Sequence, residues 1–182
     1  MSLDKSVLKA SIKAMILAGY TDIPTAATAW GDAYDNYANG VASYAQDQSN
    51  DRVMTVNKSA LVSGLQTAFA DGTASGAASK IATAVTAYWT GAIFGIIFPP
   101  TIIDPLAISD VSAVVSVPGT GLALALSSIF GVLSSDADSK ASDVATAFDN
   151  NAKTVQVLCN YIATNPTPPP PILPKVTTLS VS

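Results

Sequence analysis

Large apolar residues four positions apart recur in three separate segments of this chain. An α-helix turns once in about 3.6 residues, so a spacing of four places such residues on one helix face. The pattern therefore predicts amphipathic helices at residues 4–18, 57–70 and 120–134. The residues that define these helices are Leu8, Ile12 and Ile16; Leu61, Leu65 and Phe69; and Leu122, Leu126 and Phe130.

A second apolar stretch follows each of these segments after a short polar turn. From the first copy to the second, the first stretch recurs after 53 residues and the second stretch after 51. From the second copy to the third, the corresponding offsets are 61 and 63 residues. The second stretches share the pattern large–x–x–Ala–large, in the runs Trp30–Tyr34, Ile81–Val85 and Val144–Phe148. They predict second helices at 24–46, 74–97 and 137–164.

Together the stretches predict an all-α body, a bundle of about six helices in three antiparallel hairpins. The near-constant offsets favour an internal repeat, and a plain bundle of amphipathic helices is the alternative. Asp4 and Asn57 suit helix N-caps, and Pro24 suits the first turn of the second helix. Pro99 and Pro100 must end the fourth helix, because proline cannot donate a backbone hydrogen bond.

Composition argues against an enzyme. Only 12% of the residues are charged, against about 25% in a typical protein. The chain has no histidine, which removes the commonest general base and metal ligand. Its single cysteine, Cys159, excludes an intrachain disulfide, and its apolar neighbours indicate a buried thiol. We therefore expect no catalytic residue, no cofactor, no metal and no small-molecule substrate.

Charge also bears on partners and location. The net charge is −4, and the lysines are scattered, whereas nucleic-acid surfaces need clustered Lys and Arg. We expect no nucleic-acid partner. The first residues, Met1–Lys5, lack the pattern of a signal peptide, so synthesis in the cytoplasm is expected. A surface this poor in charge favours a permanent assembly over a free monomer.

The last eighteen residues, 165–182, cannot continue the helical body. Six prolines between 166 and 174 favour an extended polyproline rod. The following run, 175–182, is rich in β-branched residues and predicts a short strand. We therefore divide the chain into a helical body at 1–164 and an extended assembly arm at 165–182.

A strand on a stiff rod has no partner of its own, so we expect the arm to dock on a neighbouring subunit by strand addition. Its side chains would then enter pockets on the partner. The partner-binding residues are predicted to be Pro168, Pro170, Ile172, Leu173, Val176, Thr177, Leu179 and Val181.

Two uncharged stretches, 81–103 and 111–135, raise the alternative of a membrane-active apolar hairpin, as in a holin or pore-forming protein. Pro99–Pro100 cuts the first stretch and Pro118–Gly119 cuts the second, and no cluster of Lys or Arg flanks either one. The stretches are better explained as buried helices, with residues 99–119 covering the bundle or contacting a neighbour. Within that loop, 111–117 is a candidate strand.

The aromatic residues of the second and fourth predicted helices permit a third interpretation. Trp30, Tyr34 and Tyr37 share one helix face, and Trp89 lies in the fourth helix. Core packing explains them best, and a free binding module with an exposed aromatic face is the alternative. Aspartates such as Asp136 are better explained as helix caps than as calcium ligands.

Several runs resemble Ala/Thr-rich virion structural proteins of tailed bacteriophages, particularly contractile-tailed ones. The runs that carry the resemblance are Leu3–Leu8, Ala29–Tyr34, Thr86–Gly91, Val117–Gly121 and Val144–Phe148. The resemblance implies a non-enzymatic particle component that is present in many copies. It also implies copies of itself and other virion proteins as partners, and a location in the virion after synthesis in the host cytoplasm.

Overall fold

The computed structural model describes residues 3–38, 42–45, 48–54, 57–90, 93–96, 106–108, 111–115, 120–132, 136–163 and 175–180. These described residues form six helices, as the sequence predicts. The helices are α1 (Lys5–Ala18), α2 (Ile23–Ala38), α3 (Lys58–Phe69), α4 (Ala74–Thr90), α5 (Thr120–Gly131) and α6 (Ala137–Ala152).

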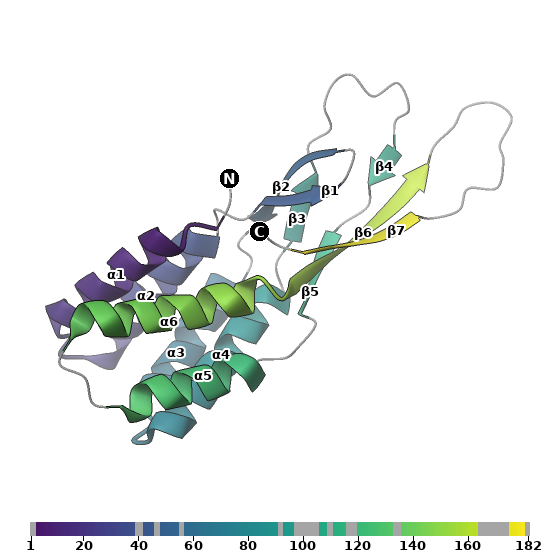
Figure 1. The fold of residues 1–182 in the computed structure, drawn as a ribbon. Coiled ribbons are helices and arrows are strands. Elements are labelled where there is room, and N and C mark those ends of the chain that lie inside the picture. The colour runs from purple at the N-terminus through teal and green to yellow at the C-terminus, as the bar shows by residue number, and fades with distance from the viewer. Residues whose placement is uncertain are drawn as a thin grey trace, which may run out of the picture.

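The six described helices form a closed ring. Each helix packs against the next one in the sequence, and α6 packs back against α1 (Figure 1). Two ion pairs join this last pair of helices: Lys9 Nζ lies 2.7 Å from Asp138 Oδ2, and Lys13 Nζ lies 2.9 Å from Asp138 Oδ1. A single carboxylate of α6 therefore connects to two successive turns of α1.

The second helix of each hairpin supplies most of the core. Each of α2, α4 and α6 has seven buried residues, whereas α1 and α3 have three each. These second helices begin at residues 23, 74 and 137, which are 51 and then 63 residues apart. At these offsets the alanines Ala27, Ala78 and Ala141 occupy equivalent positions, and all three are fully buried. The equivalence extends along the helices and supports the internal repeat.

Helix starts follow the signals in the sequence. Asp4 caps α1, since its side chain accepts a hydrogen bond from Ser6 N, and Asp136 caps α6 in the same way. Pro24 is the second residue of α2, where its missing N–H costs nothing. Asn57 stands at the N-cap position of α3 but makes no capping bond, because its Nδ2 donates to Ala87 O, 3.1 Å away.

The second helices end earlier than the sequence predicts, at Ala38, Thr90 and Ala152 rather than at 46, 97 and 164. The chain continues as strands at each of these places. Uncharged runs of apolar and β-branched residues suit a strand as well as a helix, and pairing with other strands decides between them.

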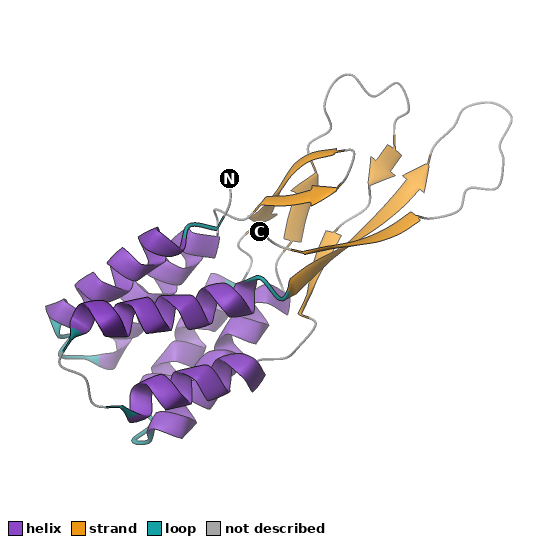
Figure 2. Cartoon of the chain, viewed as in Figure 1, coloured by secondary structure: helices purple, strands orange, loops and turns teal. Residues whose placement is uncertain are grey.

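The seven described strands gather at one end of the bundle (Figure 2). They pair antiparallel in the order β1-β2-β3-β5-β6-β4. Strands β5 and β4 pair with successive parts of one edge of β6, and β7 pairs with the opposite edge of β6. β1 and β7 also approach each other. The strands are β1 (Ala42–Ala45), β2 (Gln48–Met54), β3 (Ile93–Ile96), β4 (Leu106–Ile108), β5 (Val111–Val115), β6 (Val155–Ala163) and β7 (Lys175–Ser180).

Each helical hairpin is thus followed by strands, and the repeated unit is two helices and then strands. Strand β5 lies within 111–117, and β7 lies within the predicted strand of the arm. The proline-rich part of the arm, 165–174, lies outside the described residues.

Helix α3 packs very closely against its neighbours on both sides. A Cβ on Gly31 of α2 would lie 2.5 Å from Val62 Cγ2 of α3. A Cβ on Gly64 of α3 would overlap the Ala84 methyl group and lie 3.2 Å from Ala84 Cα. Backbone cannot move aside as a flexible side chain can, so the α3–α4 contact requires glycine at position 64.

We predict that Gly64→Ala lowers the free energy of unfolding by about 1–3 kcal/mol through overpacking, although alanine favours helix. Urea denaturation followed by circular dichroism measures the change. The matched control is Gly131→Ala in α5, where an added Cβ meets nothing within 4 Å. If Gly64→Ala is as stable as the control, the close approach of α3 and α4 is contradicted.

Candidate functional site

We call α2, α4 and α6, which supply most of the core, the inner helices, and α1, α3 and α5 the outer helices. Two buried carboxylates lie near the C-terminal ends of inner helices, close to the points where the strands begin. Asp35 of α2 and Asp149 of α6 are only 5% and 3% exposed. Tyr88 Oη donates a hydrogen bond to Asp35 Oδ1 at 2.8 Å, and Tyr37 Oη donates to Asp149 Oδ1 at 2.7 Å. These bonds join α4 to α2 and α2 to α6, so they connect all three inner helices.

A lysine accompanies each buried carboxylate. Lys153 Nζ lies 2.7 Å from Asp149 Oδ2, one helical turn away in sequence. Lys58 Nζ lies 3.6 Å from Asp35 Oδ2 and 2.7 Å from Asp32 Oδ1. Each carboxylate therefore has one oxygen bonded to a phenol and the other facing an ammonium group. Such pairing offsets the cost of burying the charge.

The tyrosines act as permanent hydrogen-bond donors. Burial raises the pKa of Tyr37 and of Tyr88 well above the ordinary value of 10.0, and the bond to the neighbouring aspartate raises it further. Burial likewise raises the pKa of Tyr34, whose Oη accepts a hydrogen bond from Trp89 Nε1 at 2.6 Å. Each of these three phenols therefore keeps its proton near neutral pH.

The two tyrosine–aspartate bonds follow the internal repeat. Tyr88 of the second copy donates to Asp35 of the first copy, and Tyr37 of the first copy donates to Asp149 of the third. The repeat offsets place Tyr37 and Tyr88 at equivalent positions, and likewise Asp35 and Asp149. Sequence patterns do not reveal this network, because aligning the three copies shows the equivalence of these positions but not the bonds between them.

The third copy interrupts the pattern. The third copy has Asn151 at the position of Tyr37 and Tyr88. The second copy has Thr86 at the position of Asp35 and Asp149. Thr86 Oγ1 donates to Ala82 O at 2.9 Å within its own helix. Donor and acceptor are therefore both absent at this place, and each of the two buried carboxylates among the described residues keeps its phenol.

The aromatic residues form part of the core, as the sequence analysis favoured. The ring of Tyr34 packs against four neighbouring aromatic rings in edge-to-face or tilted orientations. The distances between its centroid and theirs are 5.3–6.4 Å. Trp89 is fully buried and Trp30 packs on Phe69 at 5.9 Å. A binding face that exposes Trp89 is therefore ruled out.

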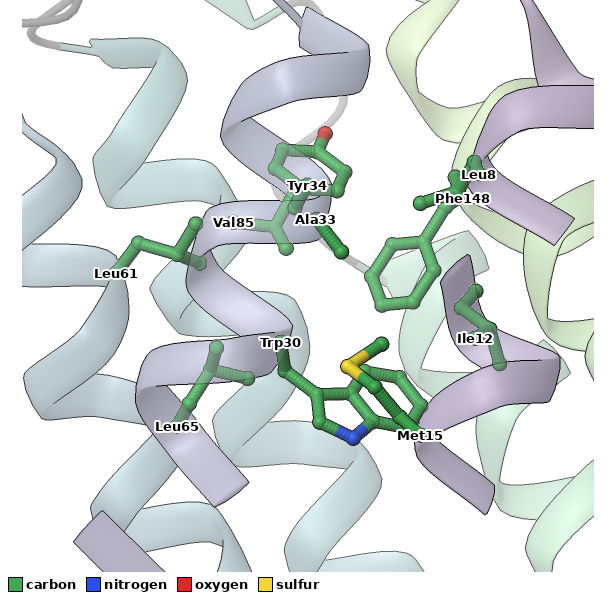
Figure 3. A pocket seen from close by; sticks show the side chains of 10 residues that line it. All are labelled: Leu8, Ile12, Met15, Trp30, Ala33, Tyr34, Leu61, Leu65, Val85 and Phe148. Atoms are coloured by element: carbon green, nitrogen blue, oxygen red, sulfur yellow. The ribbon is translucent and has the colours of Figure 1, made fainter. Parts of the chain in front are cut away.

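A small cavity lies between α1, α2, α3, α4 and α6, beside Trp30 of α2 and Phe148 of α6 (Figure 3). Its volume of about 10 Å³ is close to that of a single water site, and its walls are almost wholly apolar. Neither its size nor its lining suits an organic ligand. The described residues also contain no group of three or more candidate metal ligands.

The structure accounts for the aspartates that the sequence analysis weighed as caps. Asp136 caps α6 with bonds to two backbone N–H groups. Asp138 instead accepts bonds from Lys9 and Lys13 of α1, and these bonds lower its pKa to about 2. In this structure Asp136 therefore forms a helix cap and Asp138 forms ion pairs.

The predicted partner-binding residues lie partly on β7. Val176, Thr177 and Leu179 pair with Asn160, Cys159 and Val157 of β6 in the same chain. This structure contains a single chain, so docking on a neighbouring subunit stays a prediction. The remaining members of the set, which lie outside the described residues, are Pro168, Pro170, Ile172, Leu173 and Val181.

Comparison with protein-family models, with curated proteins and with solved structures finds no match to this chain. Among the described residues, no helix has the length and apolar character that crossing a membrane requires.

We predict that Tyr37→Phe lowers the free energy of unfolding by about 1–3 kcal/mol, because Asp149 stays buried without its phenol donor. Chemical denaturation of both proteins measures the difference. The matched control is Tyr20→Phe, since Tyr20 is 38% exposed and its substitution should change stability little. Equal effects of the two substitutions would contradict a role for the buried bond.

We also predict that the ion pairs between α1 and α6 make stability depend on acid. The pKa of Asp138 is lowered in the folded state, so its contribution is complete above the ordinary value of 3.8 and is lost as the pH falls through about 2. Asp138→Asn should therefore destabilise the protein at pH 6 and have little effect near pH 2. Urea denaturation at both pH values tests this.

The matched control for Asp138 is Asp143→Asn, which removes an exposed carboxylate from the same helix. Asp143 makes no ion pair in the described part of the chain, so this variant should show no such difference between pH 6 and pH 2. An equal loss of stability for both variants at pH 6 would show that net charge, rather than the α1–α6 contact, is responsible.

Proposed function

We propose that this chain is a non-enzymatic structural subunit of a bacteriophage particle. It assembles through the surface of the helical bundle and through its C-terminal arm, which docks on a neighbouring subunit. Its partners are copies of itself and other virion proteins, and its location is the virion, after synthesis in the host cytoplasm. The resemblance described above supports the particle, while the arm supports the mode of assembly.

The pairing of β7 with β6 is the observation that carries this proposal. Six residue pairs join the two strands, from Gln156 with Ser180 to Tyr161 with Lys175. The proline-rich segment 164–174 separates the strands in sequence. The same edge of β6 in another copy offers β7 the same backbone hydrogen bonds, so exchange between subunits costs little pairing energy.

The outer surface of the bundle also suits assembly. Large apolar side chains are exposed on the outer helices α1 and α5, including Leu17 at 68% and Leu124 at 74%. Val132, just after α5, is 60% exposed. Exposed apolar side chains on a surface with few charges favour contact with other proteins over solvation.

We predict that deleting residues 166–182 leaves the bundle helical but abolishes incorporation into particles. Circular dichroism of the purified variant and its amount in purified particles, relative to the full chain, measure the two effects. A deletion of Ser182 alone is the control and should assemble normally. Incorporation of the 166–182 deletion at the level of the full chain would contradict the role of the arm.

A cross-link identifies the strand that receives the arm. Cys159 is the only cysteine and pairs directly with Thr177, at a separation suitable for a disulfide. Thr177→Cys should therefore yield disulfide-linked oligomers on non-reducing gels when particles are oxidised, if β7 is exchanged between copies. Thr154→Cys, at the position just before β6, is the control. Intrachain disulfides alone would show that β7 stays on its own subunit.

A further inference from the structure

The face of α1 that points away from the core carries exposed apolar residues at helical spacing. The core face of this helix holds Leu8, Ile12 and Met15. A turn of about 100° per residue places positions 7, 10, 14 and 17 on the opposite face. All four positions are exposed, with Val7 at 50% and Leu17 at 68%. We call these residues the α1 stripe: Val7, Ala10, Ala14 and Leu17.

The fold does not require an apolar outer face on this helix. At the repeat offset of 53 residues, Ala10 corresponds to Ser63 of α3, and Ala14 corresponds to Thr67. Both of these α3 residues are exposed, so an outer helix of the same bundle carries hydroxyl groups on this face. The α1 stripe is therefore specific to the first copy, and an exposed apolar face that the fold does not need favours a partner.

The order of side-chain sizes along the stripe is the same in both directions. It reads large, small, small, large, in steps of three, four and three residues. A second α1 that runs antiparallel therefore places Val7 opposite Leu17 of the other copy and brings the small residues together at the centre. A contact about a twofold axis needs such a self-complementary surface. Small central residues also let the two helix axes approach to about 8 Å, the short end of the usual range.

We propose that the α1 stripe is a contact between two copies of this chain, which pair α1 against α1 in antiparallel orientation. Steps of three, four and three residues are the spacing by which paired helices keep one seam in contact. For its place in a particle the inference rests on the proposed function, since it names one of the bundle surfaces through which copies assemble.

The charges beside the stripe are compatible with this pairing. Lys13 lies next to the stripe on the side of α6, and its Nζ is 2.9 Å from Asp138 Oδ1. Its charge is therefore offset within each copy. The stripe itself carries no charge, and residues 14–21 contain none. A strongly charged partner surface would lose water here without gaining an ion pair, whereas a second α1 matches the stripe.

The size of the contact predicts a weak dimer. The stripe extends about 15 Å along α1. Tyr20 and Ile23, 38% and 39% exposed, continue the apolar surface beyond the end of the helix. Stable interfaces bury about 1,200–2,000 Å² in total, which is more than a pair of short helices supplies. We therefore expect a dimer that dissociates on dilution and that gains strength where many copies assemble.

Sedimentation equilibrium of the isolated full-length chain, from about 5 to 500 µM, tests the pairing. We expect a reversible monomer–dimer equilibrium. Ala14→Glu adds a carboxylate to both small layers of the dimer, so it should weaken dimerisation at least about tenfold. The matched control is Thr67→Glu, which adds the same charge at the equivalent exposed position of α3 and should leave dimerisation unchanged. Circular dichroism checks that both variants keep their helices.

A second variant tests the antiparallel register. Ala10→Lys alone should weaken dimerisation as Ala14→Glu does. In an equimolar mixture of the two variants, the new carboxylate of one copy faces the new ammonium group of the other, and the second small layer keeps its alanines. The mixture should therefore dimerise at least about tenfold more tightly than either variant alone. A mixture that pairs no better than its components would overturn the proposed contact.

Two further outcomes would also overturn the proposal. One is a full-length chain that stays monomeric throughout the concentration range, and the other is a dimer that Ala14→Glu does not weaken. Binding of the full-length chain to phosphatidylcholine vesicles, if Ala14→Glu abolishes it, would assign the stripe to a lipid surface in place of a second copy.

Failure here is distinguishable from failure of the assembly role, because sedimentation needs no particle. The arm deletion and the cross-link measure assembly and do not involve α1. A chain that stays monomeric in solution but needs its arm for incorporation would retain the proposed function and lose only this inference. A chain that pairs through α1 but is absent from particles would show the reverse.

Discussion

The hydrogen bonds from Tyr88 to Asp35 and from Tyr37 to Asp149 are the interactions on which the rest of this structure depends. A carboxylate can remain buried at these positions only because a phenol and an ammonium group satisfy it. The bonds lie near the ends of the inner helices, beside the points where the chain leaves the bundle as strands. They connect α2, α4 and α6 close to the residues where these helices end.

Close backbone packing complements these polar contacts. Gly31 and Gly64 let α3 approach α2 on one side and α4 on the other, while the inner helices present small residues such as Ala27, Ala78 and Ala141 to the centre. The many alanines of this chain thus have a structural reason. Small side chains let six helices close into one ring, and the large aromatic residues are concentrated around Tyr34.

The sequence predicted the helix starts well because local chemistry determines them. Asp4 and Asp136 cap helices through bonds to residues two or three positions away, and such signals are visible in any local reading. The ends of α2, α4 and α6 could not be predicted in this way, since strand pairing with distant segments decides them. The tyrosine–aspartate bonds are similar, because their partners stand 53 and 112 residues apart. Aligning the repeats places Tyr37 with Tyr88 and Asp35 with Asp149, but it does not pair the tyrosines with the aspartates.

Covalent linkage of the three hairpins has a consequence for the divergence of the copies. In a trimer of identical hairpins, each substitution would appear three times, so replacing the tyrosine would remove every tyrosine bond. In this chain the replacement of one tyrosine and its acceptor occurs once, and the other two bonds remain. A single polypeptide can thus keep two tyrosine–aspartate bonds while the third pair of positions carries other residues.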